Sequence, residues 1–106
     1  MSKIDQLAGA FARTIRTRSD INYGGERVGL FILGASAVAG KYPIPLTVAD
    51  IMNGFERDGI KVSGTGANRR TIDAGIKNLT DAGLLQVRPH STTQGGGARN
   101  LYFLKV

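Results

Sequence analysis

The chain has 106 residues, of which 42% are hydrophobic, and a net charge of +6 at neutral pH. This length is typical of one domain with a modest core. The absence of cysteine and the single histidine, His90, exclude disulfides, thiolate metal ligands and histidine-rich metal sites. No apolar run reaches the roughly 18 residues of a membrane span, and the N-terminal segment lacks the apolar core of a signal peptide. We therefore expect a cytoplasmic protein without a cofactor, a metal or a membrane partner.

The positive charge is concentrated at both ends of the chain. Residues 1–18 carry four basic side chains against one acidic side chain, and residues 60–106 carry seven against two. The middle, residues 19–59, carries three basic and five acidic side chains. Clustered positive charge favours a partner that carries phosphates, which points to nucleic acid.

The first predicted element is an amphipathic basic helix within residues 1–20, a packing or dimerisation segment ahead of a domain at 21–106. Apolar side chains recur there at spacings of three and four, at Ile4, Leu7, Phe11 and Ile15. Arg13, Arg16 and Arg18 either contact phosphates or keep this helix soluble.

A second helix, mostly buried, is predicted from about Glu26, because Tyr23-Gly24-Gly25 favours a break before it. The segment is apolar nearly all round, so it needs cover on more than one side. The N-terminal helix, or the same helix of a second subunit, would provide that cover. Pro43 and Pro45 end the helix.

A third helix is predicted to begin after the N-cap Thr47, with Asp50 in a capping-box position, and to end near Gly59. Its apolar stripe consists of Val48, Ile51, Met52 and Phe55. The glycine-rich segment 63–68 follows it. That segment lacks the lysine and hydroxyl pair of a phosphate-binding P-loop, which argues against nucleotide binding.

A fourth helix is predicted over 69–82, between the N-cap Asn68 and the stop at Gly83. Ile72, Ile76 and Leu79 share one face, beside Gly75, where a neighbouring helix can cross closely.

Two strands then form a predicted hairpin, over 84–88 and 99–106. The polar loop between them contains three consecutive glycines, and we expect it to be exposed and mobile. Tyr102 and Phe103 alternate on the second strand, so one of them faces the core.

The order of these elements resembles the winged helix-turn-helix superfamily, as in MarR-like and related small bacterial regulators. Three segments carry the resemblance: LTVADIMNGF (46–55), NRRTIDAGIKNLTDAGLLQV (68–87) and RNLYFLKV (99–106). It implies an α+β fold in which helices are followed by a two-stranded β-wing, here with an extra N-terminal helix. The chain departs from the family in the long connection from Phe55 to Asn68 and in the lack of a helix after the wing. A dimer must therefore use the N-terminal helix or the helix from Glu26.

The resemblance implies that the helix 69–82 lies in the major groove of DNA and that the wing, residues 88–99, follows the backbone or the minor groove. Arg69 and Arg70 oppose the helix dipole, and they suit bidentate contacts with guanine or phosphate. Asn68 caps the helix or contacts adenine, whereas His90 is an exposed loop side chain. The full set of predicted DNA-binding residues is Asn68, Arg69, Arg70, Thr71, Lys77, Arg88 and Arg99.

We therefore expect a sequence-specific double-stranded DNA-binding protein, a transcriptional regulator that acts as a homodimer. Two alternatives stay open: a plasmid or phage replication or partition factor that assembles on repeated sites, and a winged-helix RNA-binding or protein-interaction module. We expect no enzymatic activity and no catalytic residue, because Ser36, Ser63 and Ser91 have no candidate histidine partner except His90.

Overall fold

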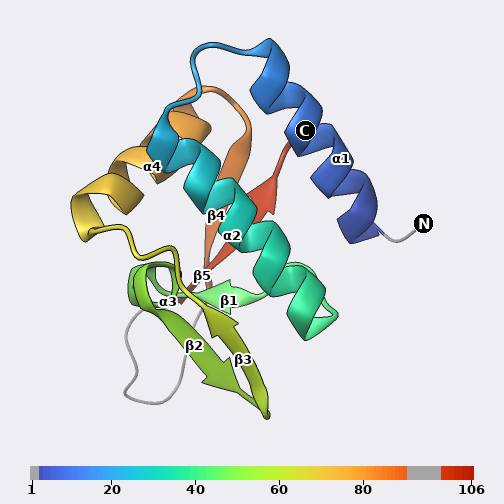
Figure 1. Cartoon of the computed structure of the whole chain (residues 1–106), viewed down its shortest axis with the longest axis vertical. Coiled ribbons are helices and arrows are strands. Elements are labelled where there is room, and N and C mark those ends of the chain that lie inside the picture. Colours follow the sequence, from blue (N-terminus) through green and yellow to red (C-terminus); the bar gives the residue numbers. More distant parts are fainter. Residues whose placement is uncertain (1–2, 91–98) are drawn as a thin grey trace.

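The helix α2, Tyr23–Ala39, runs through the centre of the computed structural model, which describes residues 3–90 and 99–106 (Figure 1). The described residues form an α+β unit of four helices and two small antiparallel sheets, which confirms the predicted class. The other elements, in chain order, are α1 (Lys3–Thr17), β1 (Pro45–Leu46), α3 (Val48–Asn53), β2 (Gly54–Arg57), β3 (Ile60–Ser63), α4 (Arg69–Asp81), β4 (Leu85–His90) and β5 (Arg99–Leu104).

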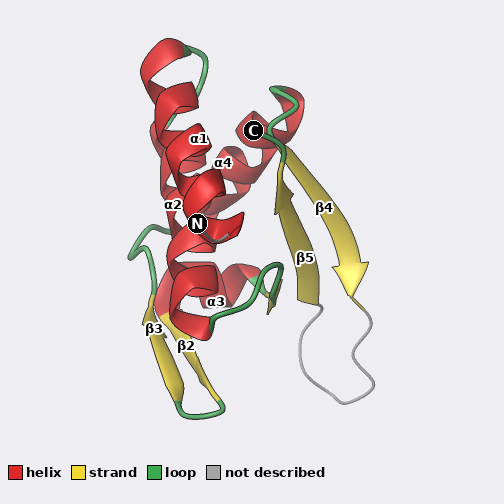
Figure 2. Ribbon diagram, turned by 90° about the vertical axis from the view of Figure 1, so that its right-hand side faces the viewer, coloured by secondary structure: helices red, strands yellow, loops and turns green. Residues whose placement is uncertain are grey.

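The larger sheet has the strand order β1-β5-β4, so the short strand before α3 pairs with the last strand of the chain. Leu85 pairs with Leu104 and His90 with Arg99 in the β4–β5 hairpin, while Pro45 of β1 pairs with Leu101. The helices pack on one side of this hairpin, and the β2–β3 and β4–β5 hairpins extend toward the same end of the molecule (Figure 2). The two hairpins thus leave the helical part as separate projections.

The hydrophobic core draws on every helix and on both sheets. Its fully enclosed side chains include Phe11, Val28, Ile32, Leu46, Ile51, Ile72, Leu79 and Tyr102. The N-terminal helix covers one side of α2 as predicted, because Phe11 lies against Gly29, where an added Cβ would come within 2.0 Å of the ring. Tyr102 is the residue of its pair that faces the core, and Phe103 lies on the other side of β5.

The predicted start of the second helix is wrong by three residues. The helix begins at Tyr23, and the Asn22 side chain caps it by accepting a hydrogen bond from the Gly25 N–H at 2.7 Å. Gly24 and Gly25 are buried inside the helix, because α4 and the side chain of Asn78 lie directly against them. Because these two glycines lack side chains, they allow α4 to pack closely, and they do not break the helix.

The predicted third helix is correct at its start and wrong at its end. The capping box of Thr47 and Asp50 forms as expected, but α3 ends at Asn53. The chain then turns through a hairpin in which Arg57 pairs with Ile60, and the two residues between them have positive φ, 51° at Asp58 and 78° at Gly59. An Asp-Gly pair with two left-handed residues is the favoured turn for a two-residue hairpin loop.

The fourth helix and the hairpin after it follow the prediction closely. Asn68 is the N-cap of α4, and Gly83 adopts the left-handed conformation just beyond its end. The first hairpin strand continues to His90, two residues farther than predicted. Residues 91–98 of the loop that we expected to be mobile lie outside the described residues.

Candidate nucleic-acid interface

The first turn of α4 presents two arginines to solvent. Asn68 caps the helix by accepting a hydrogen bond from the Thr71 N–H at 2.9 Å, so its side-chain oxygen is already engaged. Arg69 and Arg70 follow it, both exposed, and the first turn contains no acidic residue. The unpaired N–H groups and the positive end of the helix dipole add to the charge of the arginines. This end of α4 is therefore a positively charged surface suited to an anion.

The opposite face of α4 fixes the direction in which these arginines point. Ile72, Gly75 and Leu79 are buried against the core. The Asn78 side chain accepts a hydrogen bond from the Asn22 N–H at 2.9 Å and donates one to the Asp20 carbonyl at 2.8 Å. The helix is thus held along its whole length.

Two ion pairs run along the exposed face of α4. Arg69 lies 3.5 Å from Asp73, and Lys77 lies 2.8 Å from Asp81, each one turn along the helix. The hydrogen bond that the Lys77 ammonium donates to the Asp81 carboxylate raises the pKa of Lys77. Such exposed pairs contribute little stability, so both cations can exchange their carboxylate for a phosphate at low cost. Within the described part of the chain, Arg70 makes no ion pair.

The outer face of the β4–β5 hairpin carries a second group of basic side chains. The guanidinium of Arg88 lies 5.4 Å from the centre of the Phe103 ring, and the Lys105 ammonium lies 5.9 Å from it. His90 is exposed as expected, but it is the last residue of β4 and does not lie in the loop, and it pairs across the hairpin with the half-buried Arg99. The role of Phe103 as a platform for two cations was missed from the sequence, although its alternation with Tyr102 gave the signal.

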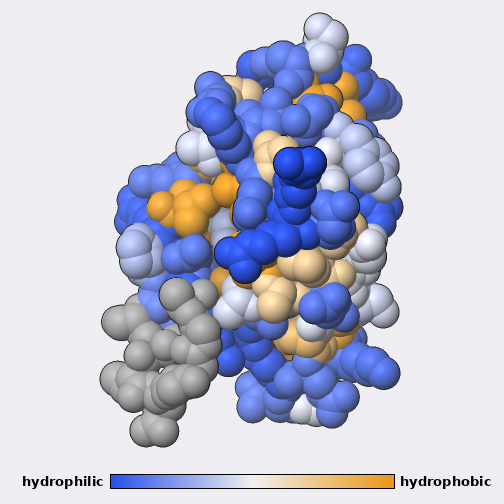
Figure 3. All heavy atoms as spheres, turned by 90° about the vertical axis from the view of Figure 1, so that its left-hand side faces the viewer, coloured by the Kyte–Doolittle hydropathy of each residue, from blue (hydrophilic) through white to orange (hydrophobic). Residues whose placement is uncertain are grey.

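The structure therefore places the seven predicted site residues on two elements. Asn68, Arg69, Arg70, Thr71 and Lys77 belong to α4 and its cap, whereas Arg88 and Arg99 belong to the hairpin. Thr71 is half-buried, unlike the two arginines before it. Figure 3 views the side of the molecule from which α4 begins, and hydrophilic residues cover most of that surface, around a small orange patch and a broader pale-orange area.

Arg18 lies at the other end of α4. Its guanidinium donates a hydrogen bond to the Ala82 carbonyl at 3.3 Å and forms an ion pair with Asp20 at 2.5 Å. This contact raises the pKa of Arg18 and lowers that of Asp20. Since α4 has 13 residues, its two ends are about 18 Å apart. Arg18 therefore supports the C-terminal end of the helix, far from the paired arginines.

The described residues contain no group of three or more histidine, cysteine or acidic side chains arranged to hold a metal ion. No helix in residues 3–90 or 99–106 has both the length and the hydrophobicity to cross a membrane.

Neither a known protein family, nor a curated protein, nor a solved structure matches this chain.

Proposed function

We propose that this protein is a sequence-specific double-stranded DNA-binding protein of the winged helix-turn-helix class. In this proposal α4 enters the major groove, and the β4–β5 hairpin is the wing, which follows the backbone or the minor groove. The observation that carries the proposal is the exposed pair Arg69 and Arg70, on the first turn of a helix whose other face is buried. Two arginines there oppose the helix dipole, and a partner with guanine edges or phosphates compensates that cost.

The arrangement of α3 and α4 supports this assignment despite the long connection between them. The connection is taken up by the β2–β3 hairpin, and backbone hydrogen bonds from Thr65 to Ile51 and from Gly66 to Met52 return the chain to α3. The two helices therefore pack together before the β4–β5 hairpin follows, which is the order that the resemblance implies.

The roles of the basic residues differ in this proposal. Arg69 and Arg70 reach base edges or the flanking phosphates, and Lys77 neutralises a phosphate farther along the groove. Arg88 and Arg99 contact the backbone or a narrow minor groove. The protein binds DNA without chemistry of its own. As a transcriptional regulator it acts as a homodimer on a palindromic site. Sedimentation of the protein with and without duplex DNA tests this oligomeric state.

The experiment begins with selection from a pool of random duplexes, followed by fluorescence anisotropy on the selected site over a salt series. The double variant Arg69→Ala/Arg70→Ala should bind selected and scrambled duplexes alike, because each lost bidentate base contact costs about 1–3 kcal/mol of discrimination. The matched control, Arg13→Ala/Arg16→Ala, removes the same charge from exposed positions of α1 and should retain the preference. The assignment would be overturned if the α4 double variant still preferred the selected duplex over the scrambled one. Tighter binding to structured RNA than to any duplex would also overturn it.

A further inference from the structure

The β2–β3 hairpin is a sheet of two strands, so one edge of β3 has no neighbouring strand among the described residues. Arg57 and Ile60 flank the two-residue turn and exchange backbone hydrogen bonds, and Val62 again directs its N–H and C=O groups at β2. Lys61 and Ser63 direct theirs away from β2, and no backbone hydrogen bond within the described residues uses these outward groups. Such an edge is a template for pairing with another strand.

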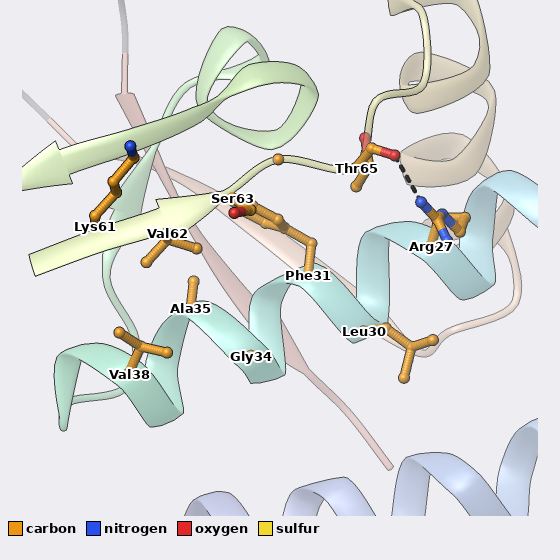
Figure 4. A pocket seen from close by; sticks show the side chains of 11 residues that line it. Arg27, Leu30, Phe31, Gly34, Ala35, Val38, Lys61, Val62, Ser63 and Thr65 are labelled. Atoms are coloured by element: carbon orange, nitrogen blue, oxygen red, sulfur yellow. Dashed lines mark hydrogen bonds between the residues drawn. The ribbon is translucent and has the colours of Figure 1, made fainter.

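This edge borders a groove of about 450 Å³ whose other wall is α2. Lys61 lines the groove although its side chain points away from α2, so the backbone of β3 forms this wall (Figure 4). Val62 and Ala35 are buried between the strand and the helix, and the half-exposed Leu30 and Val38 continue the apolar lining along α2. Backbone hydrogen-bonding groups on one side and apolar side chains on the other fit an extended strand.

The part of the chain that carries this groove edge has no net charge. Residues 23–63, which include α2 and the β2–β3 hairpin, carry four basic and four acidic side chains, so the net charge of +6 belongs to the rest of the chain. Two copies of a basic protein repel each other least where they meet through such a region. The groove therefore suits a second copy of this chain, which leaves the basic surfaces of both copies open to solvent.

We propose that two copies of this chain pair through the edge of β3. The two strands run antiparallel about a two-fold axis, with Val62 opposite its own counterpart and Lys61 opposite Ser63 of the partner subunit. Lys61 and Ser63 then exchange the backbone hydrogen bonds that their outward groups offer. The two hairpins form one sheet in the order β2-β3-β3-β2, and the same patch of both copies meets, as a two-fold interface requires.

This pairing also covers an exposed apolar part of α2. Val62 points to the α2 side of its strand, so both copies of α2 lie under the same face of the joined sheet (Figure 4). Val38, which is 55% exposed, lies at the same end of the groove as Val62 and becomes buried near the axis. The second subunit thus provides the further cover that a helix apolar nearly all round requires.

The cations of the groove do not oppose this pairing. The Lys61 side chain lies on the face of the sheet away from α2, directly across from a neutral serine (Figure 4). Arg27 lies at the far end of the groove, where it donates a hydrogen bond to the Thr65 carbonyl at 2.6 Å. The two-fold axis at Val62 therefore keeps the two copies of Arg27 apart.

The pairing identifies the interface of the homodimer, and it rests on the proposed function for the role of that dimer. The pairing itself does not require DNA, because every contact in it is between two copies of this chain. Arg69 and Arg70 stay outside the interface, since neither residue lines the groove.

The first test is sedimentation velocity of the full chain without DNA over a range of concentrations. Ser63→Pro removes the outward N–H and places a ring in the path of the second strand, and proline is tolerated where an edge-strand N–H faces solvent. We expect the dimer dissociation constant to rise at least about tenfold. The matched control Ser63→Ala removes only the hydroxyl group and should change this constant by less than about twofold.

The helix side of the interface is tested with an added charge. Val38→Lys places two like charges near the axis and should also raise the dissociation constant at least about tenfold, while circular dichroism checks that the variant is folded. Ala8→Lys adds the same side chain to an exposed position of α1 and should leave the dimer unchanged. Dissociation by Ala8→Lys alone would identify α1 as the interface and overturn the pairing.

The register is tested by oxidation, since the chain contains no cysteine of its own. Directly opposite residues that exchange no hydrogen bonds have Cα atoms about 4.5 Å apart, within the range of a disulfide. Val62→Cys should therefore form a covalent dimer. Ile60→Cys should not, because its two copies lie about 13 Å apart along the strands. A covalent dimer from Ile60→Cys and none from Val62→Cys would overturn this register.

Two other results overturn the pairing, and they differ in what they leave standing. A chain that stays monomeric at every concentration overturns the pairing together with the homodimer part of the proposed function, and the groove is then left to a peptide or a small molecule. DNA binding through Arg69 and Arg70 keeps its own test. A dimer that neither Ser63→Pro nor Val38→Lys weakens overturns the pairing alone and leaves the homodimer standing.

Discussion

Gly75 of α4 packs directly on Gly24 of α2: a Cβ added at Gly75 would lie 2.3 Å from the carbonyl carbon of Gly24. The converse is equally tight, because a Cβ at Gly24 would lie 2.5 Å from the Thr71 carbonyl oxygen. Both neighbours are backbone, which cannot move aside as a flexible side chain does. The distance between these helices, and with it the direction of the first turn of α4, depends on two glycines.

The variant Gly75→Ala should therefore destabilise the fold by about 1–3 kcal/mol, the usual cost of forcing a methyl group into a packed interior. Gly34→Ala is the matched control, since it also adds a methyl to a helical glycine but into open space. Helix propensity should make the control more stable than the parent by about 0.5–1 kcal/mol. Urea unfolding of the three proteins measures the two effects, and a Gly75→Ala variant as stable as the parent would contradict the close crossing.

The sequence predicted Gly75 as a crossing point but not its partner. Gly75 interrupts a clear apolar stripe, and such an interruption indicates a close neighbour. Gly24 stands before the apolar run of α2, where a glycine pair is typical of a turn. A glycine can break a helix or let a second helix pack closely against it. Which of the two occurs depends on the element that packs there in the fold, and the local sequence does not specify that element.

The end of α3 was mispredicted for a related reason. Phe55 continues the helical spacing of Val48, Ile51 and Met52, so periodicity favoured a longer helix. In the structure Phe55 lies on β2 and still reaches the core. Its ring packs edge-on against the ring of Phe31, with 6.4 Å between the two ring centroids. The Asp58-Gly59 pair was the stronger local signal, because it specifies a hairpin turn.

The local geometry of α4 was predicted well, and the long-range contacts that hold this helix were not predicted. The cap by Asn68 follows from the capping preference of asparagine, and the exposure of Arg69 and Arg70 follows from helix periodicity. The roles of Arg18 and Asn78 could not be predicted, since each binds backbone groups more than 50 residues away in the chain.

Arg57 joins the β2–β3 hairpin to the capped start of α3. Its guanidinium pairs with the Asp50 carboxylate, donates to the Pro45 carbonyl, and lies 4.4 Å from the Phe55 ring centre. Asp50 also accepts a hydrogen bond from the Thr47 N–H at 3.0 Å. All these groups are at least partly buried, so their contacts are screened less than those of a surface pair.

Arg57→Gln should lower the free energy of unfolding by about 1–3 kcal/mol, because it leaves the Asp50 carboxylate without its cation. Lys61→Gln removes an exposed cation from the adjacent strand and should change stability by less than about 0.5 kcal/mol. A cycle that adds Asp50→Asn measures the coupling by urea unfolding. Additive effects of the two single substitutions would show that the pair contributes nothing.

Stability should decrease at alkaline pH because of Tyr102. Burial raises the pKa of its hydroxyl above the ordinary value, against an opposing hydrogen bond with Asn100, and burial likewise raises the pKa of Tyr42. A folded-state pKa above the unfolded one gives stability that is fully present below the unfolded pKa of about 10 and is lost as pH rises through the folded pKa. Unfolding free energy should thus fall as the pH is raised above about 10.

Tyr102→Phe should make that alkaline decrease shallower, and the part due to Tyr42 should remain. The experiment is urea unfolding of the parent and the variant at several pH values on either side of the tyrosine titration. The control Tyr23→Phe removes a hydroxyl from an exposed side chain and should follow the parent curve. Parallel curves for Tyr102→Phe and the parent would mean that this hydroxyl does not govern the alkaline decrease.

The acidic residues on the exposed face of α4 give a direct test of how DNA meets this helix. Asp73 lies 3.5 Å from Arg69, on the face that the proposed function places in the major groove. There its carboxylate repels nearby phosphates and competes with them for Arg69. Asp73→Asn should therefore bind duplex DNA about twofold to tenfold more tightly at low salt, with a steeper salt dependence, because one more cation is free to displace counterions.

Asp58→Asn removes the same charge from the exposed turn of the β2–β3 hairpin, which the proposal leaves off the DNA. Fluorescence anisotropy over a salt series compares the two variants with the parent. Equal gains would show that only net charge matters and that α4 has no special position on the duplex, whereas a gain confined to Asp73→Asn places this face of the helix against the phosphates.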